Sequence, residues 1–420
     1  MTDITNWDWE TGEKKIPFGD WKSEFRWVEE PYASPDGEQV AAIVNVDEGE
    51  FSVCINGERW ETSFDKAWYL RYSPDGRLTV LVSEAGEWTV AVDGNAWDNR
   101  FGYVWNTLFS RDGAKIAVAF QQDMSYGIAI DDLPWEATYT SLTYPHLSSD
   151  GTASAAVVQT VNFTGADIDT YQKGAYTAAA NGQAWDRNFV NVWGLAFSAD
   201  SRHLAAEVRL TLYDYTIAVD GTPWPKTFGA VWPAIFHPRT AAVIAPARIG
   251  AKWQLMQDAQ PLWERAFVQI WDQVVGPDGE TLAAVVAPEF GKWTVAVNGT
   301  PWRITFPDLV TDLRFSPDGR RVGAVTKRGN NWGIAIDGVA WQNTFEMAWP
   351  PVFSPDGRTV AAKVQKNGKY SVTVNDRIWP RECEAIWDPL FSPDSSRILI
   401  RSIEDGIYHR RVLPVSDGIA

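Results

Sequence analysis

The chain has 420 residues, of which 45% are hydrophobic and 22% charged, and its formal net charge is −17. This composition is that of a folded chain with a sizeable core, which excludes intrinsic disorder. The charge argues against a nucleic-acid surface, because phosphates are neutralised by an excess of lysine and arginine. Two cysteines and four scattered histidines form no disulfide framework, haem motif or metal-ligand spacing, so we expect no cofactor and no metal.

The amino-terminal sequence, MTDITNWDWE, has neither the basic region nor the apolar run of a secretory signal. No segment approaches the ~18 consecutive apolar residues of a transmembrane helix. We therefore expect no direct membrane span and a cytoplasmic location, either free or peripheral on the inner face of the cytoplasmic membrane.

A turn of the type S-P-D-G recurs along the chain at intervals of 37 to 40 residues, with one interval of 50. A tryptophan lies 13 or 14 residues before each turn, and an aromatic residue or Cys383 follows that tryptophan four residues later. In seven repeats another tryptophan lies eight residues beyond the first. The ten turns begin at Ser34, Ser73, Ser110, Ser148, Ser198, His237, Gly276, Ser316, Ser354 and Ser392. This regularity indicates ten copies of one structural unit.

Each unit is predicted to contain four short strands. The turn is followed by an apolar segment such as 280–286 (ETLAAVV), and then by an alternating segment such as 293–299 (WTVAVNG). The N-G or D-G dipeptide that ends the second segment is a strong hairpin signal. The W-x3-F segment and one more strand complete the unit. Four strands in about 40 residues are typical of a propeller blade.

The sequence therefore predicts an all-β fold, a β-propeller of about ten four-stranded WD40-like blades. The last turn is followed by only two strands, so we expect the N-terminal segment 21–25 to complete the last blade and close the ring. Residues 17–420 are assigned to a single propeller and residues 1–16 to an N-terminal extension, with two smaller propellers as the alternative. An insertion at 159–175 falls inside the fourth unit, and we expect it to protrude from one rim and contribute to an interface.

The S-P-D-G-x-x-x-A-x-x-V pattern resembles the WD40-like PD40 repeat of the periplasmic Tol-pathway propeller family. The W-x3-F-x3-W signature resembles the tryptophan-rich subunit of the Tmc transmembrane redox complex of sulfate-reducing bacteria. This second resemblance implies partner subunits, namely a multihaem cytochrome c, a membrane cytochrome b and an iron–sulfur protein. It implies no cofactor on the tryptophan-rich subunit itself, and this chain has no C-x-x-C-H motif.

The W-x3-F tryptophans are interpreted as core residues that fill the space between adjacent blades, because each aromatic side chain buries a large area. Sugar binding by stacked indoles is the alternative. Four other tryptophans begin the third strand of their repeats after a polar loop, and we expect them to be partly exposed and to contact a partner. They are Trp88, Trp253, Trp293 and Trp332.

The aspartate of the S-P-D-G turn is interpreted as a cap on its own backbone rather than as a Ca²⁺ ligand. A second set of acidic residues shares one position in the predicted innermost strand, where they would make the mouth of the central channel acidic and attract a basic partner or a cation. These four residues are Glu30, Asp272, Asp312 and Asp388.

These patterns favour a non-enzymatic protein-interaction scaffold, a peripheral cytoplasmic subunit of a bacterial transmembrane electron-transfer complex. No nucleophile elbow, metal cluster or phosphate loop is present. Cys54 and Cys383 are both predicted to be buried rather than nucleophilic. A carbohydrate-binding propeller and a glycosidase-like propeller with an unrecognised carboxylate pair remain as alternatives.

Overall fold

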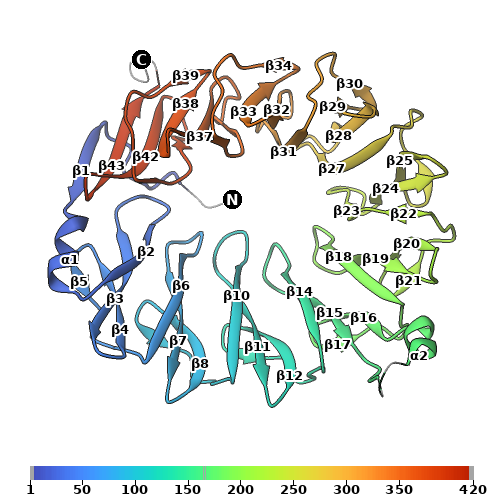
Figure 1. Cartoon of the computed structure of the whole chain (residues 1–420), viewed down its shortest axis with the longest axis horizontal. Coiled ribbons are helices and arrows are strands. Elements are labelled where there is room, and N and C mark those ends of the chain that lie inside the picture. The colour runs from blue at the N-terminus through green and yellow to red at the C-terminus, as the bar shows by residue number, and fades with distance from the viewer. Residues whose placement is uncertain (1–3, 164, 166, 416–420) are drawn as a thin grey trace.

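The computed structural model describes residues 4–163, 165 and 167–415 of the chain. Its strands form ten antiparallel sheets, and these sheets stand as blades around one ring (Figure 1). The predicted ten-bladed β-propeller is therefore confirmed, and the ring is single. In each blade the first strand lies nearest the ring axis and the fourth lies at the periphery (Figure 1).

The inner strands and their neighbours have the following bounds. The inner strands are β2 (Val28–Ala33), β6 (Lys66–Tyr72), β10 (Tyr103–Phe109), β14 (Leu142–Leu147), β18 (Asn191–Phe197), β22 (Ala230–Val231) with β23 (Ile235–Phe236), β27 (Gln269–Val275), β31 (Leu309–Phe315), β35 (Met347–Ala348) with β36 (Val352–Phe353), and β40 (Ala385–Ile386) with β41 (Leu390–Phe391). The second strands are β3 (Val40–Asp47), β7 (Leu78–Glu84), β11 (Ile116–Gln122), β15 (Ser154–Gln159), β19 (Leu204–Arg209), β24 (Val243–Ile249), β28 (Leu282–Glu289), β32 (Val322–Arg328), β37 (Val360–Lys366) and β42 (Arg397–Glu404).

The outer half of each blade is shorter. The third strands are β4 (Glu50–Ile55), β8 (Glu87–Val92), β12 (Ser125–Ile130), β16 (Tyr176–Ala180), β20 (Tyr215–Val219), β25 (Lys252–Gln257), β29 (Lys292–Val297), β33 (Asn331–Ile336), β38 (Lys369–Val374) and β43 (Ile407–Pro414). The fourth strands are β5 (Glu58–Arg59), β9 (Asn95–Ala96), β13 (Leu133–Pro134), β17 (Gln183–Ala184), β21 (Thr222–Pro223), β26 (Gln260–Pro261), β30 (Thr300–Pro301), β34 (Val339–Ala340), β39 (Arg377–Ile378) and, in the last blade, β1 (Gly12–Ile16).

Most inner strands contain a bulge at one repeated position. The residue there has a positive φ in seven blades, for example 54° at Asn106 and 52° at Gly194, and the register with the second strand shifts at this point. The inner strand is broken in two in blades 6, 9 and 10. Pro233 and Pro350 occupy the position in the first two, and in blade 10 Asp388 stands there and is followed by Pro389. Proline holds φ near −65° and cannot adopt the bulge conformation, which accounts for the interruption in blades 6 and 9.

The W-x3-F segments lie between blades, as expected for core residues. Trp263 is 6% exposed, and its ring packs on the next blade's hairpin turn, where a Cβ added to Gly299 would lie 3.4 Å from the indole. Phe267, four residues later, forms a bridge with Trp253 of its own blade and is 1% exposed. The glycine of the hairpin turn thus supplies both the positive φ and the space that the indole needs.

The ring closes through the N-terminal segment, as predicted, but the closing strand is a different one. Strand β1 pairs along β43, whereas the segment 21–25 forms a short helix, α1 (Trp21–Glu24), after a 3-10 turn at Phe18–Asp20. The expectation that Trp21 begins the closing strand is therefore wrong, and part of the 1–16 extension belongs to the last blade. The edge of β43 is already paired with β1, so the segment after β1 is free to turn and cross to the first blade.

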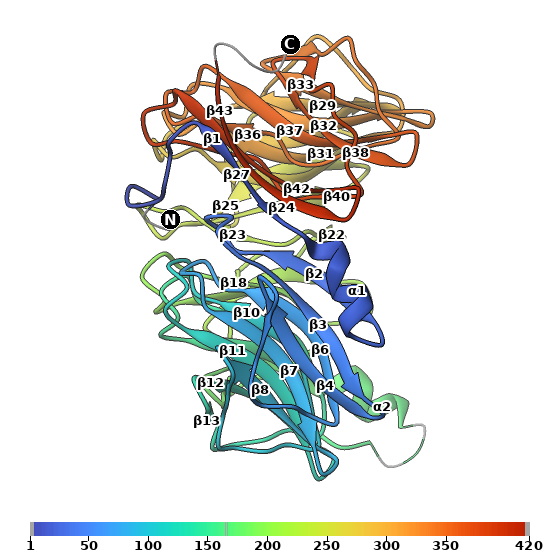
Figure 2. The same ribbon diagram turned by 90° about the vertical axis from the view of Figure 1, so that its left-hand side faces the viewer.

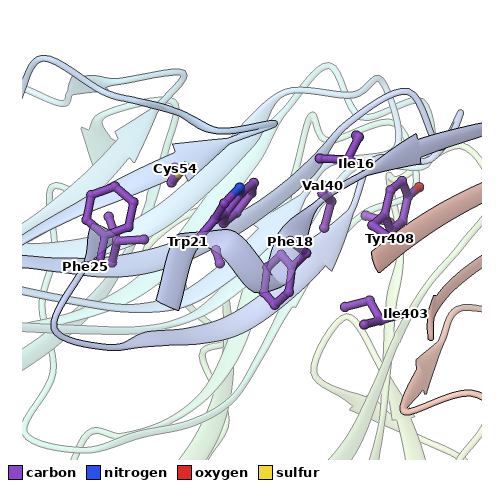
Figure 3. Close-up of a cluster of buried hydrophobic side chains, with 11 residues drawn as sticks. Ile16, Phe18, Trp21, Phe25, Val40, Cys54, Ile403 and Tyr408 are labelled. Carbon is purple, nitrogen blue, oxygen red and sulfur yellow. The ribbon is translucent and has the colours of Figure 1, made fainter. Parts of the chain in front are cut away.

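The crossing segment seals the join between the last and first blades with apolar side chains (Figure 3). Phe18 and Trp21 pack with Ile403 and Tyr408 of the last blade and with Val40 of the first. Tyr408, fully buried, also donates a hydrogen bond to the Gly37 carbonyl at 2.8 Å. The other blades follow one another along the chain, whereas the ring is closed here by hydrophobic burial and by the pairing of β1 with β43.

The insertion at 159–175 contains one short helix, α2 (Ile168–Lys173), which lies at the outer edge of blade 4 on the same side of the ring as α1 (Figure 2). The Tyr171 hydroxyl donates to the Asn191 side chain of blade 5 at 2.7 Å, so the insertion contacts the neighbouring blade. Positions 164 and 166 of the insertion lie outside the described residues, as do residues 1–3 of the N-terminal extension. A role of this segment in an interface stays a prediction.

Candidate functional site

Blade 5 differs from the other blades in having a buried carboxylate in its second strand. The fourth residue of its second strand is Glu207, which is 8% exposed and lies directly opposite Trp193 in the β18–β19 register. Seven blades have an uncharged residue at this position, and two have a cation. The equivalents are Ile43, Leu81, Ala119, Val157, Pro246, Val285, Val325, Lys363 and Arg401.

The two cations at this position have partners, but Glu207 does not. Arg401 donates from Nη1 to the Ser34 carbonyl at 2.9 Å, across the closing join. The Lys363 ammonium lies 4.5 Å from the ring centroid of Trp349 and 5.2 Å from that of Tyr370. Within the described part of the chain, the Glu207 side chain has neither a hydrogen-bond partner nor an ion pair. A buried polar group without a partner costs free energy, so its presence suggests a functional role.

Glu207 lines a pocket of about 740 Å³ where blades 5 and 6 meet. Blade 5 contributes Trp193 and Tyr215, and the Trp232 and Trp253 side chains come from blade 6. Tyr144, at the bulge of blade 4, also lines the pocket, and 55% of its surface is exposed. A cavity of this size with aromatic walls and few polar groups is the usual form of a small-ligand site.

The aromatic walls of the pocket are ordered by stacking. Trp232 and Trp253 lie with their centroids 5.5 Å apart and their planes at 10°. The Trp193 and Tyr215 centroids are 6.3 Å apart, with the planes at 21°. Trp232 lines the pocket and keeps 37% of its surface exposed, so part of its indole can contact a ligand. Such stacked pairs are rigid and lose little conformational entropy when a ligand binds.

Gly194 makes room for the carboxylate. It occupies the bulge position, which holds a residue with a side chain in the nine other blades. A Cβ built on Gly194 would lie 2.3 Å from Oε1 of Glu207. The φ of 52° alone does not demand glycine, since Asn106 has a φ of 54° at the same position in blade 3. The contact with Glu207 therefore explains the glycine.

Burial raises the pKa of Glu207 to about 8, so the carboxyl is protonated at neutral pH in the unliganded pocket. The other titratable or charged groups that line the pocket are Tyr144, Tyr215 and Arg248. The Arg248 side chain donates from Nη2 to the Gly229 carbonyl at 2.9 Å, and the residue is exposed. It forms no ion pair with Glu207.

The four tryptophans expected to contact a partner are packed within their own sheets. Trp253 is 7% exposed, so the expectation of partial exposure is wrong there, whereas Trp88, Trp293 and Trp332 are half-buried. An aromatic residue occupies this strand position in every blade and packs against the tryptophan of the inner strand wherever one is present. The seven pairs are Trp68–Trp88, Trp105–Tyr126, Trp193–Tyr215, Trp232–Trp253, Trp271–Trp293, Trp349–Tyr370 and Trp387–Tyr408. Partner contact by the four tryptophans stays a prediction.

The four acidic residues expected at the channel mouth all lie in the inner-strand segments at the bulge position or its equivalent. Two of them link blades: the Glu30 carboxylate accepts from the Leu70 amide of the next blade at 2.9 Å, and Asp272 accepts from the Leu313 amide at 3.4 Å. Asp272 also lines a smaller pocket of about 400 Å³ that shares Trp232 with the pocket around Glu207. Attraction of a basic partner by this set, which includes Asp312 and Asp388, stays a prediction.

The S-P-D-G aspartates cap their own turns. Ser316 donates its hydroxyl to the Asp318 carboxylate at 2.5 Å, and the backbone amide of Arg320 donates to the same oxygen at 3.1 Å. Across residues 4–163, 165 and 167–415, no cluster of three or more His, Cys, Asp or Glu residues is placed to hold a metal ion. Cys54 and Cys383 are both buried, as predicted, and burial raises their pKa values to about 11 and about 12.

Two solved structures that are similar to this chain are distant from it in sequence. No protein-family model matches the chain, and no curated protein matches it in sequence. A crystal structure of a eukaryotic initiation factor aligns over 90% of this chain and 89% of that one, with 16% identity and a TM-score of 0.44. A structure from a study of two prolyl endopeptidases covers 82% of this chain and 55% of that one, with 13% identity and a TM-score of 0.37. At these values neither likeness bears on function, and neither supports the resemblance to the tryptophan-rich Tmc protein.

Within the described residues, the structure has no helix that is both long enough and apolar enough to cross a membrane.

Glu207 is the functional candidate that the sequence patterns did not single out. The signal was present, because LAAEV in the fifth repeat stands where the seventh has LAAVV. The ninth repeat has VAAKV there, and so a charged residue at the position does not by itself indicate a site. Glu207 differs from Lys363 as a site candidate because, among the described residues, its side chain has no hydrogen-bond or ion-pair partner, and this is visible only in the folded structure.

Proposed function

We propose that the protein is a non-enzymatic binding propeller, an interaction scaffold whose ligand occupies the pocket around Glu207. The observation that carries this proposal is a single unpartnered carboxylate in a ligand-sized pocket with stacked aromatic walls. Binding is favoured over glycoside hydrolysis because that chemistry uses two carboxylates about 5–10 Å apart. Among the described residues that line this pocket, Glu207 is the only carboxylate.

The test is ligand binding by the full chain, measured by thermal shift and calorimetry against a panel of organic cations, neutral alcohols and neutral sugars. We expect at least one class to stabilise the wild type, and Trp232→Ala to abolish the effect. Trp349→Ala is the matched control, since Trp349 holds the same inner-strand position in blade 9, away from the pocket. If no compound distinguishes Trp232→Ala from the control, the proposed function is wrong.

Carbohydrate binding is the second candidate. Trp232 offers a partly exposed indole beside polar groups, an arrangement on which a sugar ring can stack. Binding of the sugar arm of the panel, lost in Trp232→Ala, would favour it. Turnover of a glycoside or peptide panel that is lost in Glu207→Gln would favour an enzyme instead.

We further propose that the scaffold serves as a peripheral cytoplasmic subunit of a bacterial transmembrane electron-transfer complex. The excess of acidic residues and the half-buried tryptophans of the third strands suit a basic protein partner. Purification of the native protein from membranes tests this role. We expect it to elute with subunits that carry haem or iron–sulfur absorbance, and elution as a lone monomer would refute it.

A further inference from the structure

We propose that the pocket around Glu207 binds an organic ammonium cation, which is held by the aromatic side chains and neutralised by the Glu207 carboxylate. This inference rests on the proposed binding function and specifies the chemical class of its ligand.

The aromatic side chains of the pocket supply the rings that attract a cation. Five of them, Tyr144, Trp193, Tyr215, Trp232 and Trp253, line one pocket, and a cation within about 6 Å of an aromatic ring centroid is attracted by the ring's negative face. Tryptophan is the strongest of the aromatic side chains in this interaction. An alkylammonium or quaternary ammonium group suits these walls, because its alkyl surface also gains from apolar contact.

The protein contains an internal example of the same arrangement. In blade 9 the inner-strand Trp349 and the third-strand Tyr370 stand beside Lys363, whose ammonium lies about 5 Å from both rings (4.5 and 5.2 Å). In blade 5 the equivalents of those two aromatic residues are Trp193 and Tyr215, but the residue between them is Glu207. Blade 5 thus keeps the aromatic pair and has a carboxylate at the position of the Lys363 ammonium. The Arg209 guanidinium, two residues after Glu207, lies 5.6 Å from the Tyr215 ring centroid, so the side of Tyr215 that Arg209 occupies is not available to a ligand.

Glu207 supplies the negative charge of the proposed cation site. Its carboxylate is buried, lacks a partner among the described residues, and has space that Gly194 leaves open. A cationic ligand in the pocket would provide the missing counter-charge, and an ion pair that is partly removed from solvent is stronger than a fully exposed one. Among the described residues that line the pocket, Arg248 carries the one positive charge, and it is an exposed residue whose guanidinium donates to a backbone carbonyl.

Binding is coupled to the loss of one proton. The neutral Glu207 carboxyl breaks its O–H bond, the proton goes to solvent or buffer, and the resulting carboxylate pairs with the ligand cation. Burial raises the pKa of Glu207 into the physiological range, because it disfavours the charged form of the carboxyl. Cation affinity therefore rises with pH and levels off above pH 8.

Calorimetry of the full chain with choline, tetramethylammonium and n-butylammonium tests the proposal, with 3,3-dimethyl-1-butanol as the neutral counterpart of choline. Titrations at pH 6, 7, 8 and 9, each in two buffers of different ionisation enthalpy, count the protons released. We expect at least one cation to bind at least tenfold more tightly than the neutral alcohol at pH 8. Its affinity should rise about tenfold between pH 6 and pH 7, with nearly one proton released.

Glu207→Gln should bind the cation no more tightly than the neutral alcohol, and its affinity for the cation should not depend on pH. Lys363→Gln, at the same register position in blade 9, is the control and should change neither the preference for the cation nor the pH dependence. If no cation binds more tightly than the alcohol, or if Glu207→Gln binds cations like the wild type, the inference is wrong. If a neutral ligand binds and Trp232→Ala abolishes that binding, the proposed binding function stands without the cation preference. If no probe binds to any variant, both the binding function and the cation preference are wrong.

Discussion

A Cβ placed on Gly194 would lie 2.3 Å from Oε1 of Glu207, closer than any real contact. The two residues belong to adjacent strands of blade 5, β18 and β19, and the glycine leaves the space that the buried carboxylate occupies. Among the described residues, their pairing accounts for two features found only in this blade, namely a glycine at the inner-strand bulge position and a buried acid without a hydrogen-bond or ion-pair partner.

The first prediction concerns this contact. Gly194→Asn should destabilise the protein by about 1–3 kcal/mol, because the new side chain must displace the Glu207 carboxylate or shift the bulge. Asparagine tolerates a positive φ, as Asn106 shows at the same position, so backbone strain is a minor part of the effect. Urea unfolding measures the loss. In the background Glu207→Ala the loss should shrink, and an equal loss in both backgrounds would contradict the clash.

The second prediction is a stability difference that depends on pH. Folded Glu207 keeps its proton up to about pH 8, whereas in the unfolded chain it loses the proton near its ordinary pKa of 4.5. The folded state therefore binds more protons between these values, and wild-type stability falls as the pH rises through this window.

Glu207→Gln has no such proton to lose. We expect it to match the wild type at pH 4.5 and to exceed it at pH 8.5 by up to about 5 kcal/mol, as measured by urea unfolding. Glu289→Gln is the control. Its side chain is 68% exposed and pairs with Lys292 at 2.6 Å, and because exposed ion pairs are worth at most about 1 kcal/mol, any divergence should stay within that amount. A constant difference between Glu207→Gln and wild type at all pH values would contradict the raised pKa.

The third prediction concerns the closure of the ring. Burial alone would raise the pKa of Glu13, but hydrogen bonds from Lys15 and His409 and the charge and hydrogen bond of Arg411 lower it to about 2. Glu13 lies on β1, and Arg411 and His409 lie on β43, so these bonds cross the closing pair of strands.

A carboxyl with a lowered pKa stabilises the folded state above its unfolded value, 4.5, and this stabilisation is lost as the pH falls toward 2. Glu13→Gln should therefore lower the melting temperature at pH 7 and have no effect near pH 2. Thermal unfolding followed by circular dichroism measures both. A deficit that persists unchanged at low pH would show that the ion pairs are not its cause.

The fourth prediction tests the packing between blades. Trp263→Ala removes a buried indole from the contact with the next blade's hairpin turn, and we expect a loss of about 3–5 kcal/mol in urea unfolding. Phe290→Ala removes an aromatic side chain that is 94% exposed, and it should change stability by less than about 0.5 kcal/mol. Similar losses in the two variants would refute the role given to the W-x3-F tryptophans.

Local patterns predict the repeating parts of the molecule well. The S-P-D-G turns, the hairpin glycines and the alternating strands each depend on residues that lie close together in sequence. The same patterns misplace the strand that closes the ring. The i, i+4 spacing of Trp21 and Phe25 fits a strand or a helical turn equally, and the outcome depends on which segment reaches the free edge of β43.

The ten four-stranded blades follow from the amino-acid sequence, because every repeat carries its own turns, strand alternation and interblade aromatics. Two features emerge only when the chain is folded, namely that β1 closes the ring and that Glu207 has no hydrogen-bond or ion-pair partner among the described residues. Both depend on which surfaces meet across long sequence separations, 396 residues in the case of Glu13 and His409. The charge and burial of one residue in such a contact are set by its neighbours in space, which no single repeat contains.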